Sequence, residues 1–153
     1  MNKKLIFLIV PAVLLFISSC GSTKNSTKLA DISEEEKALF NQTKGDTITI
    51  ANEETEYEII IIEPGFNQWL ISIARPEGYY TQAFLENRNA IMVTTWNQRV
   101  LQPQRYNTNL YELQINYQQG IDYGYEVNYK LYNYFIYFQR KYGQRLGPFT
   151  PRI

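Results

Sequence analysis

DYGYEVNYKLYNYFIYFQRKYG, residues 122–143, is the stretch of sequence that decides the fold. It carries seven of the chain's 13 tyrosines. At the 100° per residue of a helix, one face of it collects large apolar side chains, namely Val127, Leu131, Tyr134, Phe135, Phe138 and Tyr142. This spacing predicts a helix over 122–142. Its apolar stripe suits a core, because aromatic rings fill volume while their hydroxyl groups reach water or a carbonyl at the rim.

The opposite side of this predicted helix is also apolar, at Tyr129, Tyr132 and Ile136. These side chains either pack under a loop or strand, or they meet a partner. Tyrosine and tryptophan are frequent anchors of protein interfaces, and their rings also stack on the faces of sugars. Three readings therefore stay open for this side of the helix: core, protein-binding surface and glycan platform.

TWNQR, residues 95–99, raises a similar choice. Trp96 with the donors of Asn97 and Arg99 would suit the wall of a pocket, whereas Arg99 would otherwise cap a helix end or pair with a carboxylate. Taken together, the sequence offers one candidate partner or ligand surface, made of Trp96, Asn97, Arg99, Tyr129 and Tyr132.

Ahead of the tyrosine-rich stretch, strand and helix patterns follow one another. Polar and apolar residues alternate as in strands at 46–50, at the start of 56–62 and at 110–117. Four consecutive isoleucines, 59–62, predict a strand buried on both faces, and 52–55 would turn the first two strands into a hairpin. Helical spacing appears at 67–74 and 80–100, and Ser33 begins a capping box before a short helix to Phe40.

Cys20, the only cysteine, lies between an apolar run and a polar one. A positively charged start precedes 13 apolar residues, 5–17, fewer than the ~20 that a membrane-spanning helix needs. The run ends in the order aliphatic, small, small, cysteine, and this stretch resembles the signal of bacterial lipoproteins. The resemblance implies cleavage before Cys20, diacylglycerol on its thiol and acylation of the new amino group. The alternative is an ordinary secretory signal or a short anchor with an incidental cysteine.

The expected organisation has four parts: a lipoprotein signal peptide at 1–19, a lipidated tether with a short helix at 20–45, one domain at 46–146 and an irregular tail at 147–153. The domain is expected to be α+β, with a small sheet of about three strands packed on two longer helices. Gly21 stands where aspartate can mark retention in the inner membrane of lipoproteins. We therefore expect an outer-membrane location facing the periplasm, if the cell has an outer membrane.

Composition restricts the chemistry. Basic and acidic residues number 15 each, so the strongly basic balance of nucleic-acid-binding proteins is absent. Histidine is absent and cysteine is single, which excludes Ser-His-Asp triads, Cys-His pairs and zinc sites built from imidazole or thiolates within one chain. No phosphate-binding glycine motif is found, and no cofactor is predicted.

GFNQW (65–69), TWNQR (95–99) and DYGYEVNYKLYNYF (122–135) resemble a family of small bacterial lipoproteins whose domain has no assigned function. The resemblance spans roughly residues 55–146 and implies an envelope location, with no catalytic residue to transfer. The leading hypothesis is a membrane-anchored, non-catalytic module that binds a protein or supports an assembly. A glycan- or peptidoglycan-binding lipoprotein is the alternative, followed by a hydrolase that relies on paired carboxylates.

Overall fold

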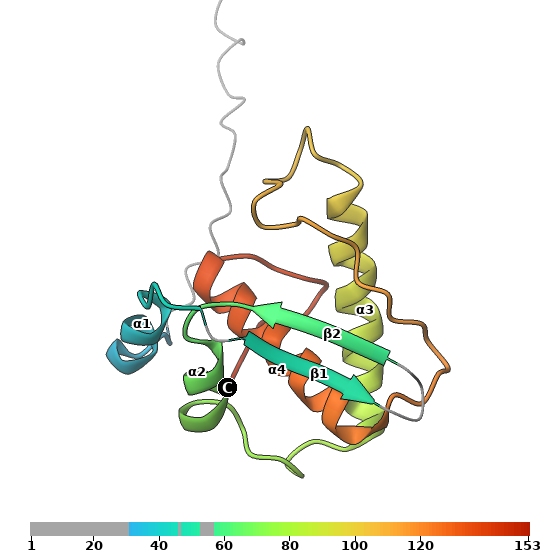
Figure 1. The fold of residues 1–153 in the computed structure, drawn as a ribbon, viewed down its shortest axis with the longest axis horizontal. Helices are drawn as coiled ribbons and strands as arrows, with labels where there is room; N and C mark the ends of the chain where they lie inside the picture. Colours follow the sequence, from blue (N-terminus) through green and yellow to red (C-terminus); the bar gives the residue numbers. More distant parts are fainter. Residues whose placement is uncertain (1–30, 46, 53–56) are drawn as a thin grey trace, which may run out of the picture.

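The structure is a computed structural model that describes residues 31–45, 47–52 and 57–153 (Figure 1). The predicted signal peptide and Cys20 lie outside the described residues. The elements follow the order α1 (Glu34–Phe40), β1 (Thr47–Asn52), β2 (Tyr57–Ile62), α2 (Phe66–Ser72), α3 (Gln82–Val100) and α4 (Gly124–Tyr142). The predicted α+β class is confirmed. None of the helices in these ranges is long and apolar enough to cross a membrane.

Helix α4 is the centre of the molecule. It runs behind the β1–β2 hairpin, and α3 lies alongside it (Figure 1). Helix α2 packs on the C-terminal half of α4, at Tyr134 and Tyr137. The predicted stripe is buried at Val127, Leu131, Phe135 and Phe138, but most other positions of the helix are buried as well. Other segments therefore cover the remaining sides of α4, which include Tyr129, Tyr132 and Ile136.

The hairpin is antiparallel, as predicted, with Ile48 opposite Ile61 and Ile50 opposite Ile59. These residues face the helices, and Ile50 and Ile61 are buried. The outer face of the sheet is uncovered: Ile60 is 57% exposed and Ile62 is 69% exposed. The prediction that 59–62 form a strand buried on both faces is thus wrong, since nothing in the described part of the chain packs on the second face.

The third strand predicted at 110–117 does not form, and the sheet has two strands among the described residues. The segment begins with turns and bends and continues without regular structure, and its backbone bonds to side chains of α3 rather than to a strand. Asn97 accepts from the N–H of Ile115 at 2.8 Å and donates to its carbonyl at 2.9 Å. Trp96 donates its indole N–H to the carbonyl of Leu113 at 2.9 Å. One carboxamide thus supplies the donor and the acceptor that a neighbouring strand would have offered Ile115.

Helix α1 and the C-terminal tail both pack against the rest of the folded body. The Ser33 hydroxyl caps α1 by accepting from the Glu36 N–H at 3.1 Å, as the capping box predicted. Pro151 in the tail is buried, as is Leu146 just before it.

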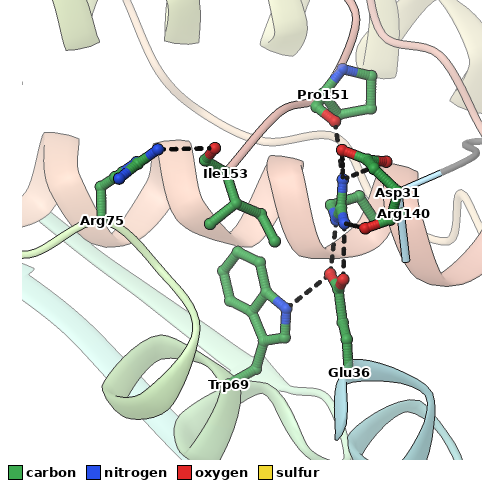
Figure 2. A network of polar contacts seen from close by, with 7 residues as sticks. All are labelled: Asp31, Glu36, Trp69, Arg75, Arg140, Pro151 and Ile153. Atoms are coloured by element: carbon green, nitrogen blue, oxygen red, sulfur yellow. Dashed lines mark hydrogen bonds and ion pairs between the residues drawn. The ribbon is translucent and has the colours of Figure 1, made fainter. Parts of the chain in front are cut away.

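A buried ion pair joins these two ends to α4 (Figure 2). The guanidinium of Arg140 donates to both oxygens of Glu36, at 2.5 and 2.6 Å, and both side chains are almost completely buried. Its remaining N–H groups reach the carboxylate and carbonyl of Asp31 and the carbonyl of Pro151. Trp69 also donates to Glu36, at 3.0 Å. All five guanidinium donors are used, which is the condition under which a buried charge is tolerated.

The aromatic core predicts a sharp response to alkali. Burial raises the pKa of eight described tyrosines: Tyr57, Tyr111, Tyr117, Tyr129, Tyr132, Tyr134, Tyr137 and Tyr142. For Tyr117 the pKa rises to about 12, through burial and then the charges of Glu86 and Tyr123. The fold therefore favours the neutral form of these tyrosines. Their contribution to stability is fully present below the tyrosine pKa of the unfolded chain, ~10, and is lost as the pH rises above it.

We therefore expect the urea midpoint to be steady up to about pH 9 and to fall steeply between about pH 10 and 12. Phenolate absorbance and circular dichroism, followed together, check this. Ionisation of all 13 tyrosines near pH ~10 with unchanged circular dichroism would contradict the buried aromatic core.

Candidate protein-binding groove

An open groove of about 650 Å³ runs beside β2. One wall is β2 with Glu63, and the other is the irregular segment 109–116. The helices supply an aromatic floor, which consists of Trp96, Tyr134, Phe138 and Tyr142. We call this feature the β2 groove. It exists because Trp96 and Asn97 hold segment 109–116 on α3, so that the segment does not close onto the sheet.

The rim of the β2 groove exposes large apolar side chains. Leu113 is 77% exposed on the segment 109–116, across from the exposed Ile60 and Ile62 of β2. Single exposed apolar residues are common on protein surfaces, but a group gathered around one concave site is typical of interaction surfaces. The groove therefore has the shape and apolar character of a site for another molecule.

Two carboxylates are the charged groups that line the β2 groove. Glu63 is neutralised locally, because Lys141 lies 2.7 Å from it and the Tyr142 hydroxyl donates to it at 2.9 Å. Glu112 is exposed and forms no ion pair with any described residue. Burial raises the pKa of Tyr134 on the floor, and the charges of Glu63 and Glu112 raise it further. The groove is thus apolar with a negative rim.

The residues of α3 that were predicted to form a surface make contacts within the fold instead. Trp96 is buried apart from its contribution to the groove floor. The Asn97 side chain forms hydrogen bonds with both backbone groups of Ile115. Arg99 donates to the Tyr111 hydroxyl, to Gln144 and to the carbonyl of Arg145. These contacts tie α3 to its neighbours and leave Trp96 as the residue of this group that touches the groove.

Tyr129 and Tyr132 lie away from the groove and are buried. The Tyr129 hydroxyl donates to the carbonyl of Arg75 at 2.8 Å. The Tyr132 ring packs edge-on against Tyr80 and Phe84, at 5.3 and 5.9 Å between ring centroids. The segment before α3 thus covers this side of α4, and the five predicted residues do not gather into one surface.

A second, polar pocket of about 440 Å³ lies between the start of α3 and residues 117–122. Gln82 donates to Glu86 at 2.8 Å and to Asp122 at 2.7 Å, so one amide bridges the two carboxylates. A glycosidase needs the space between its carboxylates for substrate or water. Here the Gln82 amide occupies that space, which gives the hydrolase hypothesis no geometric support.

Across the described part of the chain, no three aspartate, glutamate, histidine or cysteine side chains are grouped so that they could hold a metal ion. The β2 groove itself was missed by the sequence analysis. The signal that points to it is the isoleucine run: a two-stranded hairpin is too small to be buried on both faces, so every second isoleucine must face outward.

Comparison with known proteins gives one match. A family model described as a family of unknown function, DUF6146, matches residues 6–150, nearly the whole chain. No curated protein and no solved structure matches. The match begins within the apolar run and includes Cys20, the folded body and both walls of the β2 groove.

Proposed function

The chain belongs to DUF6146, a family of unknown function, and we propose that it is a lipid-anchored, non-catalytic module that binds another protein through the β2 groove. The observation that carries the proposal is the groove: an apolar concavity beside β2, rimmed by exposed Ile60, Ile62 and Leu113. A folded protein leaves such a surface open to water at a free-energy cost that a partner removes.

The anchor half of the proposal rests on the order of residues 17–20 and on the apolar run before them. Two or three acyl chains on Cys20 would hold the protein firmly on a membrane, since each buried CH₂ contributes ~0.8 kcal/mol. We propose the outer membrane, with the domain facing the periplasm, as its location. Mass spectrometry of the native protein should find an acylated N-terminal Cys20, and Cys20→Ser should release the protein from membranes. An unmodified thiol or an intact leader would refute the anchor.

The binding half is tested by site-specific photo-crosslinking in intact cells. A photoreactive amino acid at Leu113, on the groove rim, should give one discrete protein adduct. The matched control is Leu101, which is 69% exposed but lies outside the groove. A groove-specific adduct should disappear with Ile60→Lys and persist with Ile71→Lys, since Ile71 is 73% exposed on α2 away from the groove. Equal adducts from positions 113 and 101 would contradict binding at the groove.

Glycan binding is the second candidate. The polar pocket favours glycan binding in part, because its lining combines amides and carboxylates with the Tyr117 ring. Its Gln82, Glu86 and Asp122 side chains already bond to one another, however, so a sugar would have to displace these contacts. Adducts with polysaccharide rather than protein would favour this candidate over the protein-binding module.

A further inference from the structure

We infer that the β2 groove receives an extended segment of a partner protein, which adds to the sheet as a third strand along β2 and places a basic side chain near Glu112. The inference rests on the proposed protein-binding function and specifies the chemistry of its ligand. It excludes a helix or a folded surface as the element that enters the groove.

The outer edge of β2 is free. In the described part of the chain, β1 is the strand that pairs with β2, and the groove borders β2 along its length. In an antiparallel pair, every second residue turns its N–H and C=O away from its neighbour, so β2 offers a row of backbone groups on its outer edge. An extended peptide satisfies these groups by forming a ladder, whereas a helix has no free backbone groups to offer.

The wall opposite β2 is fixed. The carbonyl of Leu113 and both backbone groups of Ile115 are already bonded to Trp96 and Asn97. Segment 109–116 is therefore held on α3 and does not complete the sheet itself. The space that a third strand would fill is kept open by two side chains of α3.

The side chains around the β2 groove suit a strand with apolar residues on both faces. Side chains of a strand added beside β2 alternate between the two faces of the sheet. On one face they would meet the aromatic floor at Trp96 and Phe138, and on the other they would lie beside Ile60 and Ile62. An apolar, β-branched segment of about six residues, or about 20 Å, fits the length of β2.

The charge of the rim selects among extended partners. Glu63 is neutralised by Lys141, which leaves Glu112 as the unpaired charge of the groove. A lysine or arginine on the entering strand would pair with Glu112. A second copy of this chain fits poorly, because its own β2 with the next residue reads YEIIIIE and has carboxylates but no basic residue. The preferred occupant is therefore a basic, apolar strand from a different protein.

The full-length chain in detergent micelles tests this with a synthetic peptide, Ac-TVKVTV-NH2, followed through the two tryptophan indole N–H signals in NMR. Trp96 lines the groove, whereas Trp69 is buried against Glu36 elsewhere, so one signal reports binding and the other is an internal control. We expect millimolar peptide to shift the Trp96 signal and to leave the Trp69 signal in place. No shift of Trp96 overturns the inference.

Three comparisons identify the mode of binding. Methylating the backbone nitrogens of one alternate set of peptide residues should weaken binding at least tenfold, because it blocks the ladder with β2. Ile60→Lys should weaken binding similarly, and Ile71→Lys should leave it unchanged. Glu112→Lys should reverse the preference between this peptide and its glutamate counterpart, Ac-TVEVTV-NH2. If neither methylated set binds more weakly, strand addition is refuted.

The two proposals fail in different ways. A discrete cellular adduct at Leu113, combined with a peptide that does not respond to backbone methylation, would retain the binding module and reject the strand. The absence of any groove-specific adduct would reject the module itself.

Discussion

Replacing Arg140 with methionine is expected to destabilise the protein by about 3–5 kcal/mol, because the substitution leaves the Glu36 carboxylate buried without its cation. The side chains of both residues are almost completely inaccessible to water, and their two hydrogen bonds are short. Burial alone would lower the pKa of Arg140, but the hydrogen bonds and charge of Glu36, with Asp31, raise it. The fold therefore favours the charged guanidinium, and its loss also frees the tail at Pro151.

Urea unfolding measures this loss, and Lys130→Met is the matched control on the same helix. Lys130 pairs with Glu126 at the surface, where the Glu126 side chain is largely exposed, so its removal should cost at most about 0.5 kcal/mol. The double variant Glu36→Leu, Arg140→Met should be more stable than Arg140→Met, since it removes the unpaired charge. Equal losses for Arg140→Met and Lys130→Met would show that the pair does not hold α1 and the tail on α4.

Gly65→Ala is expected to be almost as damaging, at about 3 kcal/mol. Gly65 precedes α2 with a positive φ of 83°, which an L side chain adopts only at a cost of ~1–2 kcal/mol. A methyl group there would also lie 2.2 Å from the carbonyl oxygen of Leu39 and 3.0 Å from the Tyr137 hydroxyl. The residue sits where α1, α2 and α4 meet, so no flexible neighbour can yield.

Gly78→Ala separates the two contributions. Gly78 has nearly the same φ, 82°, but nothing lies within 4 Å of the position of the added carbon. It should cost only the conformational ~1–2 kcal/mol. The difference between the two urea midpoints therefore measures the steric contribution at the helix junction. If both variants unfold at the same urea concentration, the close packing of α1 on α2 is not a determinant of stability.

Local patterns were sufficient for the elements of this fold. The positions of α3 and α4 follow from their 3.6-residue spacing, α1 from the Ser33 cap, and β1 and β2 from alternation. Residues 110–117 show why alternation alone does not make a strand. A strand also needs a neighbour, and here the Asn97 side chain satisfies the backbone of Ile115 instead. That contact joins residues 18 apart in the chain, and periodicity carries no information about it.

The candidate site was the harder part for the same reason. The core, protein-binding and glycan readings of Tyr129 and Tyr132 stayed open because both residues lie off the main stripe of α4. The structure shows that the segment around Arg75 and Tyr80 covers them. The isoleucines of β2 were expected to be buried on both faces because four β-branched residues follow one another, but Ile60 and Ile62 face outward. Both outcomes depend on tertiary packing. Which segment covers a given face cannot be inferred from the residues of that face alone.

The central claim is that β2 accepts a third strand, and amide hydrogen exchange along residues 57–62 tests it most directly. In the free protein, the N–H groups on the outer edge of β2 should exchange faster than those bonded to β1. Saturation with Ac-TVKVTV-NH2 should slow exchange at every second residue, the set that points away from β1. Unchanged exchange along β2, despite a shifted Trp96 signal, would contradict the account.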